Sequence, residues 1–359
     1  MSRGKATRSG CAPLAARASS SSSVPILPAG FPLSAKLGAV RSIFLAACAC
    51  VALFASTDDQ QFNGRWNIMA ADAARPRIWW LEVCGAGVPN TPAKGRFLGN
   101  PIIQVEDVPR ISILDGEMRF AVERKAGRDG RGAQKLLFYA RLEDGHLKGT
   151  FEVEGDPSSY AEWSGFRSPN VTDRDDVTWK RGDPVVLFDG HDLNGWQPLN
   201  GKQPSGWLVK DGLLENSLSA QDLITDKKFL NFVLHMEFRL TGRANSGVAL
   251  RGRYEVQLTD DFDRAPSPLS SGAILGRIAP NMNAADFPGV WQSLDVRLVG
   301  RQVTVALNEI TVINRQIIEG PTTIALDATE GDPGPILLQG DRGVIEIRKL
   351  VVFPLTKTR

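Results

Sequence analysis

Three segments of this chain place Glu, Arg and Gln on one side of an alternating pattern. In Asn231–Leu240 (NFVLHMEFRL) every second residue is apolar, and the same period continues through Ser246–Arg251 and Tyr254–Thr259. A period of two is typical of a strand with one face on a core and the other facing polar surroundings. If the three strands are neighbours, one face of one sheet collects five polar side chains: Glu237, Arg239, Arg251, Glu255 and Gln257.

This composition favours a polar binding surface. Solvated sheet faces usually mix Lys, Thr, Ser and Glu, whereas the polar positions here are rich in Arg, Glu and Gln. The same residues also fit a ladder of surface ion pairs, which needs no ligand. The alternation by itself leaves both interpretations open.

The overall composition is that of a globular protein built from strands. Of 359 residues, 42% are apolar and 23% are charged, and 42 Lys and Arg against 40 Asp and Glu leave a formal charge of +2. This balance gives no indication of nucleic-acid binding. No long segment has a helical period, and 35 Gly with 22 Pro suit the many turns of an all-β protein.

Residues 1–60 are interpreted as a disordered leader and signal segment. The first part is basic and rich in Ser, Ala and Pro. Arg41 then precedes the apolar run Ile43–Ala55 (IFLAACACVALFA), which has the length of a secretory signal core and is short for a membrane span. We therefore expect an exported protein that begins near Ser56, and any contact with a membrane would be through an N-terminal anchor.

Cysteine usage predicts no disulfide framework. Cys11, Cys48 and Cys50 fall in the leader, so Cys84 is expected to be alone in the mature protein as a small buried apolar residue.

Residues 61–180 predict a small antiparallel β domain. Short alternating runs follow one another, and Asp115-Gly116 and Asp144-Gly145 lie between pairs of runs as hairpin turns. The pattern predicts a barrel or sandwich, and the opening Gly64-Arg65-Trp66 is lipocalin-like. Its tryptophans are expected in the core and at the rim. The polar segment Asn170–Pro184 marks the boundary with a second domain, residues 181–359.

The second domain carries a series of short motifs. It opens with Leu187–Trp196 (LFDGHDLNGW), continues through Asn245–Val248 (NSGV) and Tyr254–Leu258 (YEVQL), and closes with Leu338–Asp341 (LQGD). In these motifs and their order, residues 187–355 resemble the 3-keto-disaccharide hydrolase domain family. The resemblance implies a concanavalin-A-like jelly-roll sandwich.

The resemblance also implies a chemistry. Oxidation of a sugar at C3 makes the C2 proton acidic, and its removal gives an enolate that expels the C1 substituent, after which water adds to the unsaturated sugar. This route needs a base near C2 and a cation or hydrogen-bond donor near the C3 oxygen. Among the polar residues, Glu237 or Glu255 could be the base, and Arg239 or Arg251 the oxyanion stabiliser.

The same motifs imply contacts with an oligosaccharide or glycoside substrate. Gln257 would orient sugar hydroxyls, whereas Asn245 fits a turn-capping role equally well. The implied substrate-binding residues are Asn245, Gln257, Trp291, Gln339 and Asp341.

Other functions stay open at this point. Glu237 and Glu255 could be the two carboxylates of a conventional glycosidase. The closing segment Leu338–Gly343 (LQGDRG) lacks the His that family members commonly have there, which leaves a glycan-binding protein without catalysis as the alternative, and a surface scaffold as a third. No cofactor or metal ligand is assigned, although the acidic loop Asp260, Asp261 and Asp263 could hold calcium.

Overall fold

The computed structural model describes residues 58–70, 77–100, 102–126 and 132–357. Apart from one short 3-10 helix, η1 (Asp59–Phe62), all the regular elements among these residues are strands. The prediction of an all-β protein is therefore confirmed. The predicted signal segment, Ile43–Ala55, lies outside the described residues. In the described part of the chain, no helix has the length and apolar character needed to cross a membrane.

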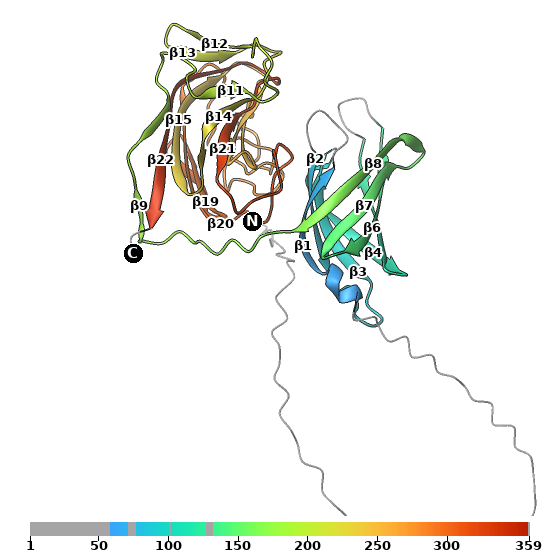
Figure 1. Ribbon diagram of the computed structural model, residues 1–359. Coiled ribbons are helices and arrows are strands. Elements are labelled where there is room, and N and C mark those ends of the chain that lie inside the picture. The colour runs from blue at the N-terminus through green and yellow to red at the C-terminus, as the bar shows by residue number, and fades with distance from the viewer. Residues whose placement is uncertain (1–57, 71–76, 101, 127–131, 358–359) are drawn as a thin grey trace, which may run out of the picture. The chain divides into compact units, whose positions relative to one another are not determined.

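The first eight strands close into an antiparallel barrel (Figure 1). Each strand pairs with the next, and β1 also pairs with β8 to complete the ring. Asp115-Gly116 and Asp144-Gly145 have positive φ angles, as expected of two-residue hairpin turns. The strands are β1 (Gly64–Ala70), β2 (Arg77–Cys84), β3 (Ala93–Gly99), β4 (Ile102–Leu114), β5 (Glu117–Arg124), β6 (Gln134–Glu143), β7 (His146–Val153) and β8 (Asp156–Arg167).

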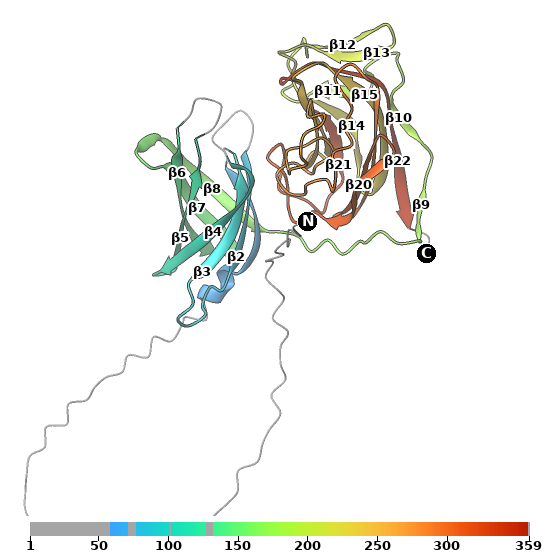
Figure 2. The same ribbon diagram turned by 180° about the vertical axis from the view of Figure 1, so that it is seen from behind.

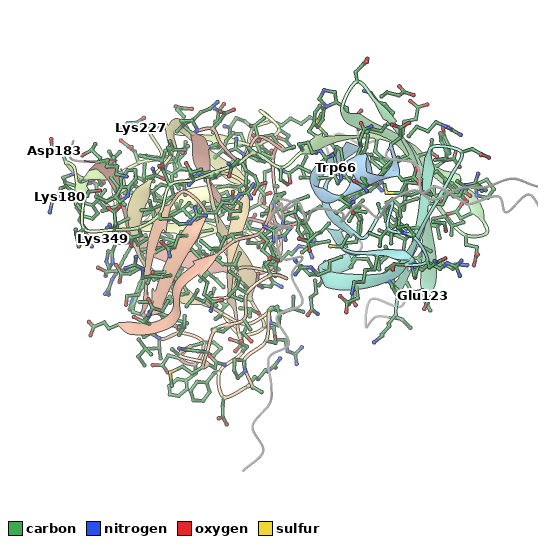
Figure 3. All side chains as sticks on the ribbon, turned by 90° about the horizontal axis from the view of Figure 1, so that it is seen from below. Trp66, Glu123, Lys180, Asp183, Lys227 and Lys349 are labelled. Carbon is green, nitrogen blue, oxygen red and sulfur yellow. The ribbon has the colours of Figure 1, made fainter. Side chains whose placement is uncertain are left out.

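Aromatic side chains fill the interior of the barrel. Trp66, which Figure 3 labels, is fully buried together with Trp79, and the rings of Phe120 and Phe138 stack with centroids 4.7 Å apart. Because side chains alternate along a strand, Trp80 faces outward between the inward-facing Trp79 and Leu81. The barrel interior is a packed core, as expected for its tryptophans.

Cys84, at the end of β2, is disulfide-bonded. The expectation of a lone apolar thiol is therefore wrong. Sequence spacing could not reveal this bond, because a disulfide requires two β-carbons brought together by the fold. The other three cysteines of the chain lie outside the described residues.

The remaining strands form two facing sheets, which Figures 1 and 2 show from opposite sides. The larger has nine strands, with β9 and β10 paired to β22 beside the path β12-β13-β22-β15-β18-β19-β20. Its strands are β9 (Trp179–Arg181), β10 (Val185–Phe188), β12 (Trp207–Lys210), β13 (Leu213–Asn216), β15 (Phe232–Leu240), β18 (Gln292–Val299), β19 (Gln302–Leu307), β20 (Ile310–Ile317) and β22 (Ile345–Lys357).

The smaller sheet has five strands in the order β11-β14-β21-β16-β17. Leu234 and Phe238 of the larger sheet and Val248 and Val256 of the smaller belong to one buried cluster, so this core lies between the two inner faces. The strands of the smaller sheet are β11 (Trp196–Pro198), β14 (Leu223–Phe229), β16 (Asn245–Leu250), β17 (Tyr254–Thr259) and β21 (Gly334–Leu338).

The described residues all belong to one compact unit, and polar contacts link its barrel strands to the loops of the sandwich. The Asn67 side chain of β1 donates to Glu330 Oε2 at 2.6 Å, and the backbone N–H of Val105 in β4 donates to the Gly276 carbonyl at 3.0 Å. The predicted boundary at residue 180 stays a prediction about which parts fold independently.

Candidate functional site

The predicted site residues lie on two different sheets. β15 pairs with β18 and β22, whereas β16 pairs with β17 and β21. The chain therefore crosses from one sheet to the other between Leu240 and Asn245. The prediction that all five polar side chains share one face is wrong, because alternation fixes the face of each strand but not its neighbours.

The two candidate carboxylates are correspondingly separated. Glu237 lies on the outer face of the larger sheet and Glu255 on the outer face of the smaller, with the shared core between them. Packed sheets are about 10 Å apart, and each of these side chains points away from the other sheet. Glu237 and Glu255 therefore cannot flank one glycosidic bond as a glycosidase pair.

The outer face of the larger sheet carries a ladder of ion pairs. Arg348 Nε donates to Glu237 at 2.5 Å, and Arg239 Nη2 donates to Glu346 at 2.9 Å. The Trp291 ring lies 4.9 Å from the Arg239 guanidinium carbon and 4.5 Å from that of Arg348. These contacts engage Glu237, Arg239 and Trp291, as the ion-pair interpretation predicts.

Charge around Glu237 favours its ionised form. Burial would raise the pKa of the Glu237 carboxyl, but hydrogen bonds from Arg348 and His235 outweigh burial and hold that pKa below its ordinary value. Lys349, labelled in Figure 3, adds a longer contact of 3.9 Å. A carboxylate stabilised in this way is a weak base, so Glu237 is poorly suited to remove a carbon-bound proton.

Arg251 is not beside Glu255 on an open face. It takes φ 55° and is followed by Gly252 at 63°, and both residues belong to the tight turn between β16 and β17. The Arg251 side chain is fully buried and donates to the backbone carbonyls of Glu330 (3.1 Å) and Gly300. These bonds engage both terminal nitrogens of the guanidinium, so an oxyanion role for them is not supported.

The outer face of the smaller sheet brings together four of the predicted residues. Glu255 and Gln257 lie on β17 and are 1% and 4% exposed. Gln257 Nε2 donates to Asn245 Oδ1 at 3.1 Å, across the pair of strands β16 and β17. Gln339 follows β21, and its backbone N–H donates to the Gly247 carbonyl at 3.0 Å. We call Asn245, Glu255, Gln257 and Gln339 the small-sheet site.

The Glu255 carboxyl lies over the backbone of Gly247 on the neighbouring strand. A β-carbon built at Gly247 would be 2.8 Å from Glu255 Cγ and closer still to Oε1, so only glycine leaves room for this side chain. The backbone N–H of Glu255 donates to the Thr322 hydroxyl at 3.0 Å, which fixes β17 to the loop after β20.

One loop pairs with the edge of this sheet, and another packs on its outer face. The segment Gly272–Gly276 runs along β17, where Leu275 N–H donates to the Glu255 carbonyl and Gln257 N–H to the Ala273 carbonyl, both at 3.0 Å. Ile324 packs on Ala249 and Leu337. Asn245 and Gln339 are partly exposed, and they mark the side from which a ligand would enter.

Gln339 Oε1 is a buried acceptor for which the described residues provide no hydrogen-bond partner. A buried amide oxygen without a partner costs about 1–3 kcal/mol. A sugar hydroxyl that donates to Gln339 Oε1 would remove this cost, which agrees with the predicted binding role.

The remaining predicted residues lie outside the small-sheet site. The Asp341 side chain is 62% exposed, with Arg342 at 3.6 Å. In the acidic loop, Asp260 accepts from the Arg243 N–H at 2.8 Å and Asp261 from the Ser271 N–H at 3.1 Å. Among the residues that the structure describes, no group of three or more His, Cys, Asp or Glu could hold a metal ion.

Sequence reasoning missed three residues near the small-sheet site: Thr322, Arg277 and Trp80. Thr322 and Arg277 lie in loops, where apolar and polar residues follow no regular alternation. Trp80 belongs to the barrel. The sequence carries no signal that would join a barrel strand to a sandwich loop.

Comparison with known proteins agrees with the motif pattern. Residues 183–352 match the family of 3-keto-alpha-glucoside-1,2-lyase-like domains. A 3-keto-disaccharide hydrolase of Bacteroides thetaiotaomicron is 30% identical over 112 residues, which are 28% of this chain and 39% of that protein. The match thus spans well under half the length of this curated relative.

Two solved structures from Parabacteroides distasonis, both provisionally named glycosyl hydrolases, are also similar. One is 28% identical with a TM-score of 0.44 and covers 52% of this chain and 91% of the other. The second is 22% identical with a TM-score of 0.40 and covers 48% of this chain and all of the other. The family match and the curated relative agree, and they show that residues 183–352 of this chain are similar to the 3-keto-disaccharide hydrolase family.

Proposed function

We propose that this protein is a carbohydrate-active enzyme that cleaves the glycosidic bonds of 3-keto-glycosides at the small-sheet site. The observation that carries the proposal is the position of Glu255, a carboxyl held against Gly247 beside the Gln257–Asn245 pair and Gln339. Similarity to the 3-keto-disaccharide hydrolase family suggests the substrate class.

In the proposed reaction, Glu255 removes the C2 proton of the bound 3-keto sugar, and the C2–H electrons form an enolate with its charge on the C3 oxygen. When the C3 carbonyl re-forms, a double bond forms between C1 and C2, and the C1–oxygen bond breaks. The departing oxygen takes up a proton. Water then adds across the double bond, with hydroxyl to C1 and hydrogen to C2, which gives a free 3-keto sugar.

Gln257, Asn245 and Gln339 have the chemistry to hold the ring. Their amides supply donors and acceptors for sugar hydroxyls, and Gln339 Oε1 gains a partner that the described residues do not give it. Because Glu255 is only 1% exposed, the sugar must displace part of the protein that covers this carboxyl, and the closed site would also exclude water from the base.

The proposal is tested by comparing p-nitrophenyl 3-keto-glucoside with the parent p-nitrophenyl glucoside. We expect release of nitrophenol from the keto sugar alone, and a loss of about two to four orders of magnitude in Glu255→Gln. Glu237→Gln is the matched control and should stay within twofold of wild type. In deuterated water, elimination and hydration should place deuterium at C2 of the product.

Other outcomes are equally informative. Equal cleavage of both glucosides without deuterium at C2 would contradict elimination. Binding of the sugar without cleavage would favour the glycan-binding alternative.

A further inference from the structure

Three buried hydrogen-bond donors without acceptors meet next to the small-sheet site. Arg277 Nη1 and Nη2 and Trp80 Nε1 are each buried, and no hydrogen-bond partner for them occurs in the described part of the chain. The Arg277 guanidinium carbon lies 4.6 Å from the centre of the Trp80 ring. Unpartnered buried donors are rare and costly, so a cluster of them indicates a ligand that supplies acceptors.

Backbone contacts hold Arg277 close to Glu255. Leu275 N–H donates to the Glu255 carbonyl, two residues before Arg277. Arg277 Nε donates to the Pro321 carbonyl at 2.8 Å, and the next residue, Thr322, accepts from the Glu255 N–H through its hydroxyl. Arg277 and Glu255 are therefore fixed to the same two loop segments.

The Trp80 indole is packed tightly between Gly320 and Arg277. It is fully buried, and a β-carbon at Gly320 would be 2.5 Å from its Nε1, so only glycine lets the indole lie there. Stacking covers one face of the Arg277 guanidinium and leaves its two terminal nitrogens at the edge of the plane.

The neighbouring charges are already matched with one another. Arg96, which also lies over Trp80 at 5.5 Å, pairs with Glu82 at 2.5 Å and with Glu319 at 2.9 Å. Glu319 also accepts from Arg65, and Glu330 from Arg301, each at 2.9 Å. Arg277 makes no comparable carboxylate contact among the described residues.

The charge of Arg277 is retained at neutral pH. Burial lowers the pKa of Arg277 to about 9, although Glu330 and Glu319 oppose the shift. A protonated guanidinium whose two terminal nitrogens have no partner among the described residues suits an oxygen that carries negative charge.

We propose that Arg277 and Trp80 form an oxyanion site beside Glu255, which holds the C3 oxygen of the 3-keto sugar as the enolate develops. The inference rests on the proposed function. It assigns to Arg277 the role that the ion-paired Arg239 and the carbonyl-bound Arg251 cannot fill. It also gives the barrel a part in the chemistry, because Trp80 comes from β2.

The test combines kinetics with the binding of a charged probe. D-isoascorbate is a sugar-sized ring that carries an enediolate anion at neutral pH, and methyl glucoside is its neutral counterpart. By calorimetry, wild type should bind D-isoascorbate. Arg277→Gln should weaken this binding at least tenfold and leave methyl glucoside binding within twofold. Trp80→Phe keeps an aromatic ring but removes the indole N–H donor. We therefore expect it to weaken D-isoascorbate binding less than Arg277→Gln does.

The kinetic arm uses the 3-keto-glucoside. Removal of one oxyanion donor typically costs about 10²–10³ in kcat, so Arg277→Gln should show such a loss with little change in KM. Arg277→Lys should recover part of the kcat that Arg277→Gln loses. Arg264→Gln, an exposed arginine of the same loop region, is the matched control. Melting temperatures identify any variant that has lost its fold.

The outcomes separate this inference from the proposed function. Glu255→Gln should lose cleavage and keep D-isoascorbate binding. If wild type cleaves no keto sugar but binds the probe through Arg277, the proposed elimination fails and the anion site stands. A folded Arg277→Gln with unchanged probe binding and unchanged kcat overturns the inference, as does a wild type that binds no probe.

Discussion

Glycine at position 247 decides how closely the Glu255 carboxyl can approach β16. A methyl group there would overlap with the Glu255 side chain, which has no room to retreat because it is buried. Displacing a catalytic group by about 1 Å can cost a factor of about 100 in rate.

We therefore expect Gly247→Ala to fold but to lose about a hundredfold in kcat on the 3-keto-glucoside. Gly242→Ala is the control, since a β-carbon at Gly242 meets no atom within 4 Å. Steady-state kinetics on the two variants decide the matter, and an unchanged kcat in Gly247→Ala would count against Glu255 as the base.

The lowered pKa of Glu237 makes a second residue-scale prediction. Its folded-state pKa lies below the unfolded value because of Arg348 and His235, so this carboxylate stabilises the fold above the unfolded pKa. That contribution disappears as the pH falls through the folded-state pKa. Glu237→Gln should thus have a lower melting temperature than wild type near neutral pH. The difference between the two melting temperatures should become smaller in acid.

Melting curves between about pH 2.5 and 7 would measure this effect, with the unfolded reference near pH 4.3. Added salt should also reduce the difference, because the Arg348 side chain is 47% exposed. If the difference in melting temperature between Glu237→Gln and wild type is the same at every pH, the ion-pair ladder does not stabilise the sheet.

At the scale of elements, Arg251 in the turn of the β16–β17 hairpin anchors this hairpin to other parts of the sandwich. Its guanidinium donates to the carbonyls of Glu330 and Gly300, so it ties the hairpin turn to two other loops. Removing it leaves buried carbonyl groups without donors, which costs about 1–3 kcal/mol.

Arg251→Met should lower the free energy of unfolding by about that amount, about 1–3 kcal/mol, in urea titrations. The kcat per folded molecule should change less than threefold. Arg243→Met provides the control, because Arg243 also has a positive φ but is exposed. If the stability of Arg251→Met is intact and its kcat collapses, the oxyanion role belongs to Arg251 instead.

At the scale of the whole molecule, Glu330 joins the barrel to the sandwich. This fully buried carboxyl accepts from Tyr254 of β17 and Arg301, both at 2.9 Å, and from Asn67 of β1. Burial and the nearby Glu330 raise the pKa of the Tyr254 hydroxyl, so Tyr254 remains a donor throughout the physiological range.

The barrel and sandwich should therefore unfold in one calorimetric transition. Asn67→Ala removes a bond across the junction and should lower or split this transition, whereas Glu123→Ala, on the exposed barrel surface labelled in Figure 3, should not. Two separate transitions in wild type would indicate independent domains, as the polar segment Asn170–Pro184 suggests.

The strands, the turns and the inward side of each strand could be predicted from the sequence, because these features depend on residues that are neighbours along the chain. The period of two predicted β15, β16 and β17 and the inward side of each. Asp-Gly pairs predicted turns that need positive φ, as at Asp115-Gly116. The ordered series of motifs from Leu187 to Asp341 carried the resemblance to the family. These features rest on steric limits and on side-chain alternation, which act over a few residues.

Only the tertiary structure decided which strands became neighbours. Glu237 and Glu255 have equivalent sequence patterns, yet the crossover after Leu240 puts them on opposite outer faces. The fold places Arg251 in a turn outside the small-sheet site. It brings Arg277 and Trp80, which are 197 residues apart in the sequence, into contact beside that site. Such contacts depend on long-range packing of a whole sandwich and barrel, for which no local pattern in the sequence provides a signal.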